Sequence, residues 1–195
     1  MEVLGNLDGN LLLWIQEFVR QDWMDGFWKW ITMLGDSGWF WILLSALLVI
    51  PRSTRQVGLT ALLALLIGAL CTNVLLKNLV ARVRPYETVE GLQRLIEAQK
   101  DFSFPSGHTC ASFAAAFVYW RKMPGKGSAA CLVLAGLIAC SRLYVGVHYP
   151  TDVLAGLCIG IGSACMAVAL WERASDVVMK KGKKKEEKKE EKKEE

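Results

Sequence analysis

The sequence predicts an all-α fold, an integral membrane helical bundle with about six transmembrane helices, mainly because apolar stretches recur along the chain. Residues 57–76 and 153–171 contain no charged residue, and shorter uncharged stretches cover 39–50 and 109–120. A helix that crosses a bilayer needs about 20 mostly apolar residues. A soluble core in a chain of 195 residues does not require so many apolar stretches.

The charge distribution is the second observation. The segment 180–195 alternates Lys and Glu pairs, and removing its nine Lys and six Glu from totals of 23 basic and 19 acidic residues leaves 14 and 13 in residues 1–179. Such a nearly neutral, apolar body does not indicate nucleic-acid binding. We expect a single transmembrane domain over 1–179, followed by a tail that is a solvated helix or a disordered extension.

The N-terminal segment, residues 1–34, gives the weakest indication of a membrane-spanning helix. Residues 11–19 have the pattern of an interfacial amphipathic helix, and 27–34 look like part of a first span. Six of the eight tryptophans lie within residues 14–41, as expected for side chains that settle at headgroup level. We expect six crossings in preference to five, with residues 35–38 as the turn before the next crossing.

Four further crossings are expected after the one at 39–50, at about 57–77, 107–120, 128–145 and 153–171. Basic residues beside spans favour the cytoplasmic side, and they occur at 52–55, at 121–126 and in the tail. We therefore expect a multi-pass protein of the cell membrane with a cytoplasmic C-terminus. The same orientation makes 78–106 an outer loop.

The positions of the cysteines indicate a role in helix packing. All six lie inside the apolar stretches, and no two form a Cys-x-x-Cys pair. Disulfide and zinc sites need clustered or loop-borne cysteines, so we interpret these residues as buried small hydrophobes.

Polar residues at membrane edges are costly and are therefore candidates for function. Eight polar or small residues stand at the ends of the expected spans: Lys77, Arg84, Ser106, Gly107, His108, Arg142, His148 and Asp152. The only two histidines of the chain belong to this set. Because two crossings separate the two histidine segments, both return to the same face, and one outer site can hold the whole set.

This set of side chains suits a phosphate. Cations and the N–H groups of a helix start bind phosphate oxygens, one imidazole can attack phosphorus, and the other can protonate the leaving oxygen. Asp152 lies four positions after His148 and can orient its imidazole. Composition alone allows either histidine to attack. Two histidines and one aspartate among several cations would repel a divalent cation, so no metal is expected.

Three arginines need separate treatment. Arg82 belongs to the membrane-edge cations that can reach the same site. Arg82 and Arg94 can equally be ordinary loop cations, solvated or in contact with lipid headgroups. Arg142 interrupts an apolar stretch and must find an anion or water, so it stays in the candidate site.

At these residues the sequence resembles the type 2 phosphatidic acid phosphatase superfamily, the membrane lipid phosphatases related to vanadium haloperoxidases. The three-part signature of that family is matched in order: Lys77, six residues and Arg84-Pro85; Pro105-Ser106-Gly107-His108; then Ser141-Arg142, five residues, His148, three residues and Asp152. One part alone is weak, since it occurs by accident in roughly one chain per thousand. All three parts in order are far rarer.

The resemblance implies a role for each residue. His148 would be the nucleophile that forms a phosphohistidine, Asp152 would fix its imidazole, and His108 would be the general acid. A second group would hold the phosphoryl oxygens and stabilise the charge of the transition state: Lys77, Arg84, Ser106, the Gly107 backbone N–H and Arg142. No cofactor is implied.

The expected substrate is a phosphorylated lipid of the bilayer, hydrolysed at the outer membrane–water interface. Small members of the family with short loops resemble bacterial enzymes that act on undecaprenyl diphosphate, phosphatidylglycerophosphate or phosphatidate, and the outward-facing site favours undecaprenyl diphosphate. Two other functions stay open. One is a non-catalytic lipid-phosphate binding or transport protein of the same fold. The other is a vanadate-dependent haloperoxidase, which the spans disfavour because such enzymes are soluble.

Overall fold

The computed structural model describes the backbone of residues 2–194 and the side chains of residues 7–176, and it contains no strand in that backbone. Its longer helices are, in chain order, α1 (Glu2–Trp14), α2 (Asp22–Met33), α3 (Trp39–Val49), α4 (Arg55–Ala69), α7 (Gly107–Lys122), α8 (Lys126–Tyr144) and α9 (Pro150–Glu194). Its short helical segments are η1 (Ile15–Val19), η2 (Asp36–Gly38), η3 (Leu70–Leu76), α5 (Lys77–Val80) and α6 (Pro85–Thr88). The all-α fold expected from the sequence is confirmed.

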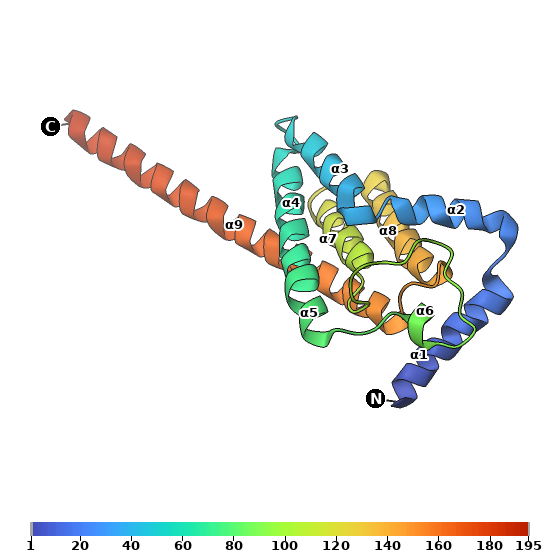
Figure 1. The fold of residues 1–195 in the computed structure, drawn as a ribbon. Helices are drawn as coiled ribbons and strands as arrows, with labels where there is room; N and C mark the ends of the chain where they lie inside the picture. Colours follow the sequence, from blue (N-terminus) through green and yellow to red (C-terminus); the bar gives the residue numbers. More distant parts are fainter. Residues whose placement is uncertain (1, 195) are drawn as a thin grey trace.

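Helix α7 occupies the centre of a bundle that also contains α3, α4, α8 and α9 (Figure 1). Three fully buried small residues, Ala114, Ala115 and Ala116, let the neighbouring helices approach it closely. Helix α9 also has a small residue at its contact with α7, Gly160. A Cβ added there would lie 2.5 Å from the carbonyl oxygen of Cys110 on α7. Backbone-to-backbone packing therefore sets the spacing between α7 and α9.

Polar side chains inside the bundle are paired across helices. The Trp41 indole on α3 is fully buried and donates to the Ser112 hydroxyl on α7 over 2.9 Å. One turn further along, the Ser45 and Tyr119 hydroxyls are 2.7 Å apart. These pairs satisfy groups that would otherwise be costly in an apolar interior, and they fix the register of α3 against α7.

Within the part of the chain that the structure describes, three helical stretches are long and apolar enough to cross a membrane: Arg55–Thr88, Lys126–Tyr144 and Pro150–Asp176. A fourth results if α2 and α3, whose axes are bent by 43° at the intervening turn, count as one broken span. The positive φ angles of Ser37 and Gly38, 51° and 66°, produce this bend. The membrane bundle is therefore supported, while the expected number of six crossings is not confirmed.

The N-terminal helices and the long loop between α5 and α7 gather at one end of the bundle (Figure 1). Gln16 binds the backbone of residues 91 and 93, and the Arg20 guanidinium donates to the Tyr144 carbonyl over 2.6 Å. Further along, the Thr32 hydroxyl accepts from Arg142 at the end of α8. This end also carries the residues singled out in the sequence. Helix α9 leaves the bundle in the opposite direction and continues through the Lys/Glu segment, whose side chains lie outside the described residues.

Candidate active site

The chain enters this end of the bundle through two local breaks in helical structure. The π-helical segment η3 ends directly before Lys77, and α5 then stops at Ala81, which adopts a left-handed conformation. Arg84 is extended because it precedes Pro85, the first residue of α6. Both cations are buried, with Lys77 at 8% and Arg84 at 3% relative exposure. The segment therefore turns two buried cations toward the interior of the same end.

His148 lies in the short connection between α8 and α9. Gly146 reverses the chain there with a φ of 74°, and Pro150 begins α9. The imidazole Nε2 is 3.2 Å from Arg84 Nη1, and Nδ1 is 3.4 Å from Asp152 Oδ2, longer than a well-formed hydrogen bond. Catalytic hydrogen bonds are often long in unliganded sites. The two ring nitrogens thus face a cation on one side and a carboxylate on the other.

Burial is the main reason why the pKa of His148 falls to about 3; Asp152 opposes the shift, and the charges of Arg142 and Arg84 add to it. The imidazole is therefore neutral near pH 7. A neutral imidazole keeps a lone pair on the nitrogen that faces Arg84, and this lone pair is what a nucleophile requires.

The Asp152 carboxylate is held from several directions. It is fully buried, and its Oδ2 accepts from the Ser103 hydroxyl at 2.5 Å and from the Tyr149 N–H at 3.0 Å. Its Oδ1 accepts from Arg82 Nη1 at 2.7 Å. Arg82 is therefore not a solvated loop cation, one of the two alternatives that the sequence left open. Arg94, the other cation treated in that way, contacts its own loop, over the Tyr86 ring and at the Ile96 carbonyl.

Arg142 brings unsatisfied donors into the site. Its guanidinium is 1% exposed and gives one hydrogen bond, from Nη1 to the Thr32 hydroxyl at 2.5 Å. Nε and Nη2 are buried and find no partner among the residues that the structure describes. Buried donors without partners cost free energy, so the position calls for an anion to complete it.

The start of α7 supplies backbone donors. Ser106 is the N-cap of the helix and accepts from the Thr109 hydroxyl at 2.9 Å. A Cβ added at Gly107 would lie 3.1 Å from the Asn73 side-chain oxygen and 3.8 Å from Lys77 Nζ. A glycine at this position lets the helix N-terminus, with its free N–H groups, stand beside the Lys77 ammonium.

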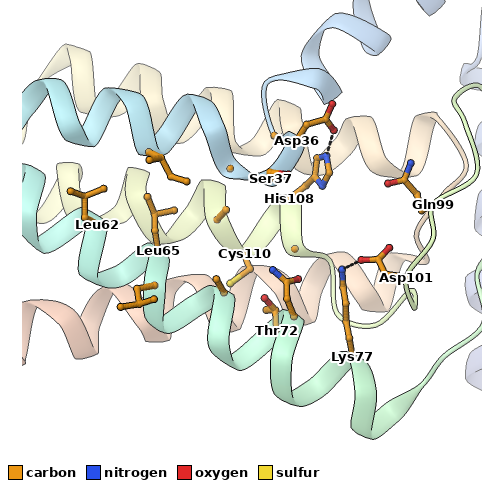
Figure 2. A pocket seen from close by; sticks show the side chains of 18 residues that line it. Asp36, Ser37, Leu62, Leu65, Thr72, Lys77, Gln99, Asp101, His108 and Cys110 are labelled. Carbon is orange, nitrogen blue, oxygen red and sulfur yellow. Dashed lines mark hydrogen bonds and ion pairs between the residues drawn. The ribbon is translucent and has the colours of Figure 1, made fainter.

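His108 lies one residue further into α7, with its Nε2 2.8 Å from the Asp36 carboxylate (Figure 2). Gly35 makes room for the ring, since a Cβ there would lie 2.6 Å from His108 Cδ2. Asp36 comes from the turn between α2 and α3 and was not among the expected site residues. An acid in a turn has no sequence signal of its own, and only the bend of the chain brings it to the histidine.

Asp101 is a second residue that the sequence did not single out. Its carboxylate bridges Lys77 and Arg84, with Oδ1 2.6 Å from Arg84 Nη2. Oδ2 pairs with Lys77 Nζ (Figure 2). Partial burial alone would raise the pKa of Asp101, yet Lys77 and Arg84 lower it to about 2. An ionised carboxylate from the loop therefore lies between two of the cations expected to bind phosphate.

A cavity of about 800 Å³ begins at this cluster and extends into the apolar part of the bundle between α3, α4 and α7. Lys77, Asp101, Gly107 and His108 line its polar end, and Leu62, Leu65 and Leu66 line its apolar end, as Figure 2 shows in part. Arg84, Arg142, His148 and Asp152 do not line it. They are buried next to its polar end, where the Asp101 carboxylate pairs with Arg84.

Comparisons with known proteins identify the family of this chain. The sequence matches the PAP2 superfamily over residues 58–176, more than half of the chain. It is 32% identical over 130 residues to an undecaprenyl-diphosphatase of Sulfolobus acidocaldarius, over 67% of this chain and 63% of that protein. This chain thus spans less than two thirds of the length of that relative.

Two solved structures resemble the fold over most of its length. The transmembrane PAP2 type phosphatidylglycerolphosphate phosphatase of Bacillus subtilis superposes with a TM-score of 0.71 and 28% identity, over 89% of this chain and 88% of that chain. For Aquifex aeolicus LpxE the TM-score is 0.74 and the identity 29%, over 84% of this chain and 95% of that chain.

Proposed function

Because this chain belongs to the PAP2 superfamily, we propose that it is a metal-independent phosphatase of a membrane lipid phosphate or diphosphate and works through a phosphohistidine. The observation that carries the proposal is the buried His148 imidazole, which has the Arg84 guanidinium at Nε2 and the Asp152 carboxylate near Nδ1. The buried, unpartnered donors of Arg142 complete a site suited to an anion.

In the first step, the Nε2 lone pair of His148 attacks phosphorus, the bond to the leaving oxygen breaks, and that oxygen takes a proton from His108. In the second step, water attacks the phosphorus and gives its proton to His108. The P–N bond breaks, its electron pair returns to His148, and orthophosphate leaves. Lys77, Arg84, Arg142 and the N–H groups at Gly107 stabilise the negative charge on the phosphoryl oxygens in both steps.

The cavity favours a lipid as the carrier of the phosphate. Its polar end holds Lys77 and His108, and its apolar end could accommodate part of a hydrocarbon chain beside Leu62 and Leu66. Among relatives, names that specify undecaprenyl diphosphate and phosphatidylglycerophosphate support a lipid substrate. We rank undecaprenyl diphosphate first, followed by phosphatidylglycerophosphate and phosphatidate.

We place the site at the outer face of the cell membrane. The connection at 50–54, the basic connection between α7 and α8, and the Lys/Glu tail all leave the end of the bundle opposite to the site. Basic segments favour the cytoplasmic side. The substrate would then present its phosphate at headgroup height on the outer leaflet.

Phosphate release in detergent micelles tests the proposal. The purified chain is assayed with EDTA present against undecaprenyl diphosphate, phosphatidylglycerophosphate and phosphatidate, and compared with His148→Ala and with the loop variant Arg94→Ala. We expect the wild type and Arg94→Ala to release phosphate and His148→Ala to lose at least about a thousandfold in kcat, the scale found for loss of a nucleophile.

Acid-labile, base-stable labelling of the wild type by a labelled substrate would identify the phosphohistidine. Turnover by a folded His148→Ala variant would exclude His148 as the nucleophile. Tight binding of a lipid phosphate without turnover by the wild type would instead favour a binding or transport protein. Activity that EDTA abolishes and Mg²⁺ restores would contradict the metal-independent mechanism.

A further inference from the structure

Arg82 joins the carboxylate beside the nucleophile to a second buried carboxylate. Its Nη1 donates to Asp152 Oδ1 and its Nη2 to Asp8 Oδ2, both at 2.7 Å. The guanidinium carbon lies 3.7 Å from the centre of the Tyr149 ring, which covers the plane of the cation. The two carboxylates together raise the pKa of Arg82, although its burial acts in the opposite direction. Arg82 is therefore fixed between two acids.

Asp8 is held as firmly on its own side. It is 5% exposed, and it accepts from the Thr151 hydroxyl at 2.5 Å and from the Thr151 N–H at 3.2 Å. Thr151 directly precedes Asp152 in the first turn of α9. Asp8 belongs to α1 and lies outside residues 58–176, the part that matches the family. The N-terminal helix thus contributes a buried charge that is linked to His148 through two intervening residues, Arg82 and Asp152.

The balance of charge indicates how Asp8, Arg82 and Asp152 act together on His148. Attack by Nε2 on phosphorus leaves a positive charge on the His148 ring, and the Asp152 carboxylate stabilises that charge. A guanidinium bound to Asp152 alone would offset this carboxylate and weaken the stabilisation. Asp8 offsets the guanidinium in turn, so that Asp8, Arg82 and Asp152 together carry one net negative charge.

We propose that Asp8 is a positioning residue that acts on His148 through Arg82 and Asp152, so that helix α1 sets the charge available to the nucleophile. The inference rests on the proposed function, because it concerns the rate at which the phosphohistidine forms. It assigns to α1 a part in the chemistry as well as in the packing of this end of the bundle.

The test is a double-mutant cycle on the full chain. Asp8→Asn keeps the shape and removes the charge. We expect it to slow phosphoenzyme formation about tenfold per labelled site, the scale of a unit charge acting across two intervening groups in a partly polar interior. KM should stay within about twofold, because Asp8 does not touch the phosphate. Asp8→Glu, which restores the charge, should recover most of the rate.

In an Arg82→Gln background, Asp8→Asn should change the rate by less than about twofold, because the group through which Asp8 acts is gone. Glu17→Gln, which removes an exposed charge from the same N-terminal segment, serves as the matched control and should leave the rate unchanged. Counting labelled sites separates the chemical rate from the fraction of folded protein.

Two results would overturn the inference. One is an equal loss from Asp8→Asn in both backgrounds, and the other is a loss in the number of labelled sites with an unchanged rate per site. Either would make Asp8 a purely structural residue while the phosphatase itself stayed intact. If the wild type neither releases phosphate nor takes up label, the proposed function fails first and the inference falls with it.

Discussion

At the scale of single residues, the cations of the site differ in whether they are already paired with an acid. Arg142 keeps two buried donors free, whereas Lys77 and Arg84 are already paired with Asp101. The Asp101 side chain is 51% exposed, so its carboxylate can turn toward solvent without unpacking the bundle. A phosphate that binds all three cations must first displace this carboxylate. We therefore expect Asp101 to compete with the substrate for Lys77 and Arg84.

Asp101→Asn should tighten competitive inhibition by orthophosphate about fivefold, the scale of one partly exposed ion pair. Because the pKa of Asp101 lies at about 2, the carboxylate stays ionised until the pH falls toward that value. The ratio of inhibition constants between wild type and variant should thus be the same at pH 5.5 and pH 8. Steady-state inhibition at both pH values measures it.

Glu97→Gln is the matched control, since it removes an exposed charge from the same loop. It should leave the inhibition constant unchanged. If both variants tighten inhibition equally, the effect is long-range electrostatics. If Asp101→Asn weakens inhibition, then Asp101 holds Lys77 and Arg84 in place for the phosphate.

At the scale of the helices, close packing between α7 and α9 positions both histidines. His108 lies in the first turn of α7, and His148 lies two residues before the start of α9. A Cβ at Gly156 would lie 2.5 Å from the Ser106 carbonyl, so even the N-cap of α7 touches the backbone of α9. The separation of these two helices therefore sets the separation of the two halves of the site.

Gly160→Ala should destabilise the bundle by about 1–3 kcal/mol, the cost of inserting a methyl group into a packed contact. The added Cβ would lie 2.5 Å from the Cys110 carbonyl and 3.1 Å from the Ala114 nitrogen, and backbone atoms cannot yield as side chains can. Thermal unfolding in detergent, followed by circular dichroism, measures the loss as a lower midpoint.

Gly162→Ala provides the comparison, because a Cβ there meets nothing within 4 Å. It should leave the midpoint unchanged or raise it slightly, since alanine favours the helix. Equal effects of the two substitutions would show that helix propensity, and not the contact with α7, controls stability here.

At the scale of the whole molecule, the cavity runs from Lys77 and His108, beside the buried remainder of the site, into the apolar interior of the bundle. The cavity is bordered by η2, α4, η3 and the first turns of α7. A hydrocarbon chain that lies along the apolar part would bring its phosphate to Lys77 and His108. The same geometry would not restrict a small soluble phosphate.

Ala69→Phe places a bulky side chain in the cavity wall and should lower kcat/KM for a long-chain lipid phosphate about tenfold, while hydrolysis of a short-chain, soluble analogue changes less than about twofold. Val133→Phe on the exposed face of α8 is the control and should affect neither substrate. Equal losses on both substrates would contradict a chain-binding role for the cavity.

The helices and most of the candidate site residues could be predicted from the sequence. Apolar stretches predicted the helices because hydropathy acts over one segment at a time, and the signature residues were identifiable because their spacing is local. The eight candidate residues meet at one end since an even number of crossings separates the two histidine segments. The sequence did not fix the number of crossings, because α2 carries both charges and aromatic side chains. This pattern suits either a span or an interfacial helix.

The sequence alone assigned no specific role in the site to four charged residues: Asp36, Asp101, Arg82 and Asp8. Asp36, Asp101 and Asp8 are isolated acids outside the three-part signature. Arg82 lies between Lys77 and Arg84 but is not one of the residues that the signature specifies. Asp8 is 74 positions from Arg82, and only the folding of α1 against the start of α9 brings the two together.

The sequence by itself determined the helical membrane class, the family signature and the set of residues suited to a phosphate, because each depends on composition and spacing within one segment. Only the tertiary structure decided which charges are paired before a substrate arrives and which are left free. Asp101 pairs with two cations, Asp8 balances Arg82, and Arg142 keeps two free donors among the described residues. These pairings join side chains from separate segments, and electrostatic energy depends on their distance in space and on their burial, neither of which is written in the order of residues.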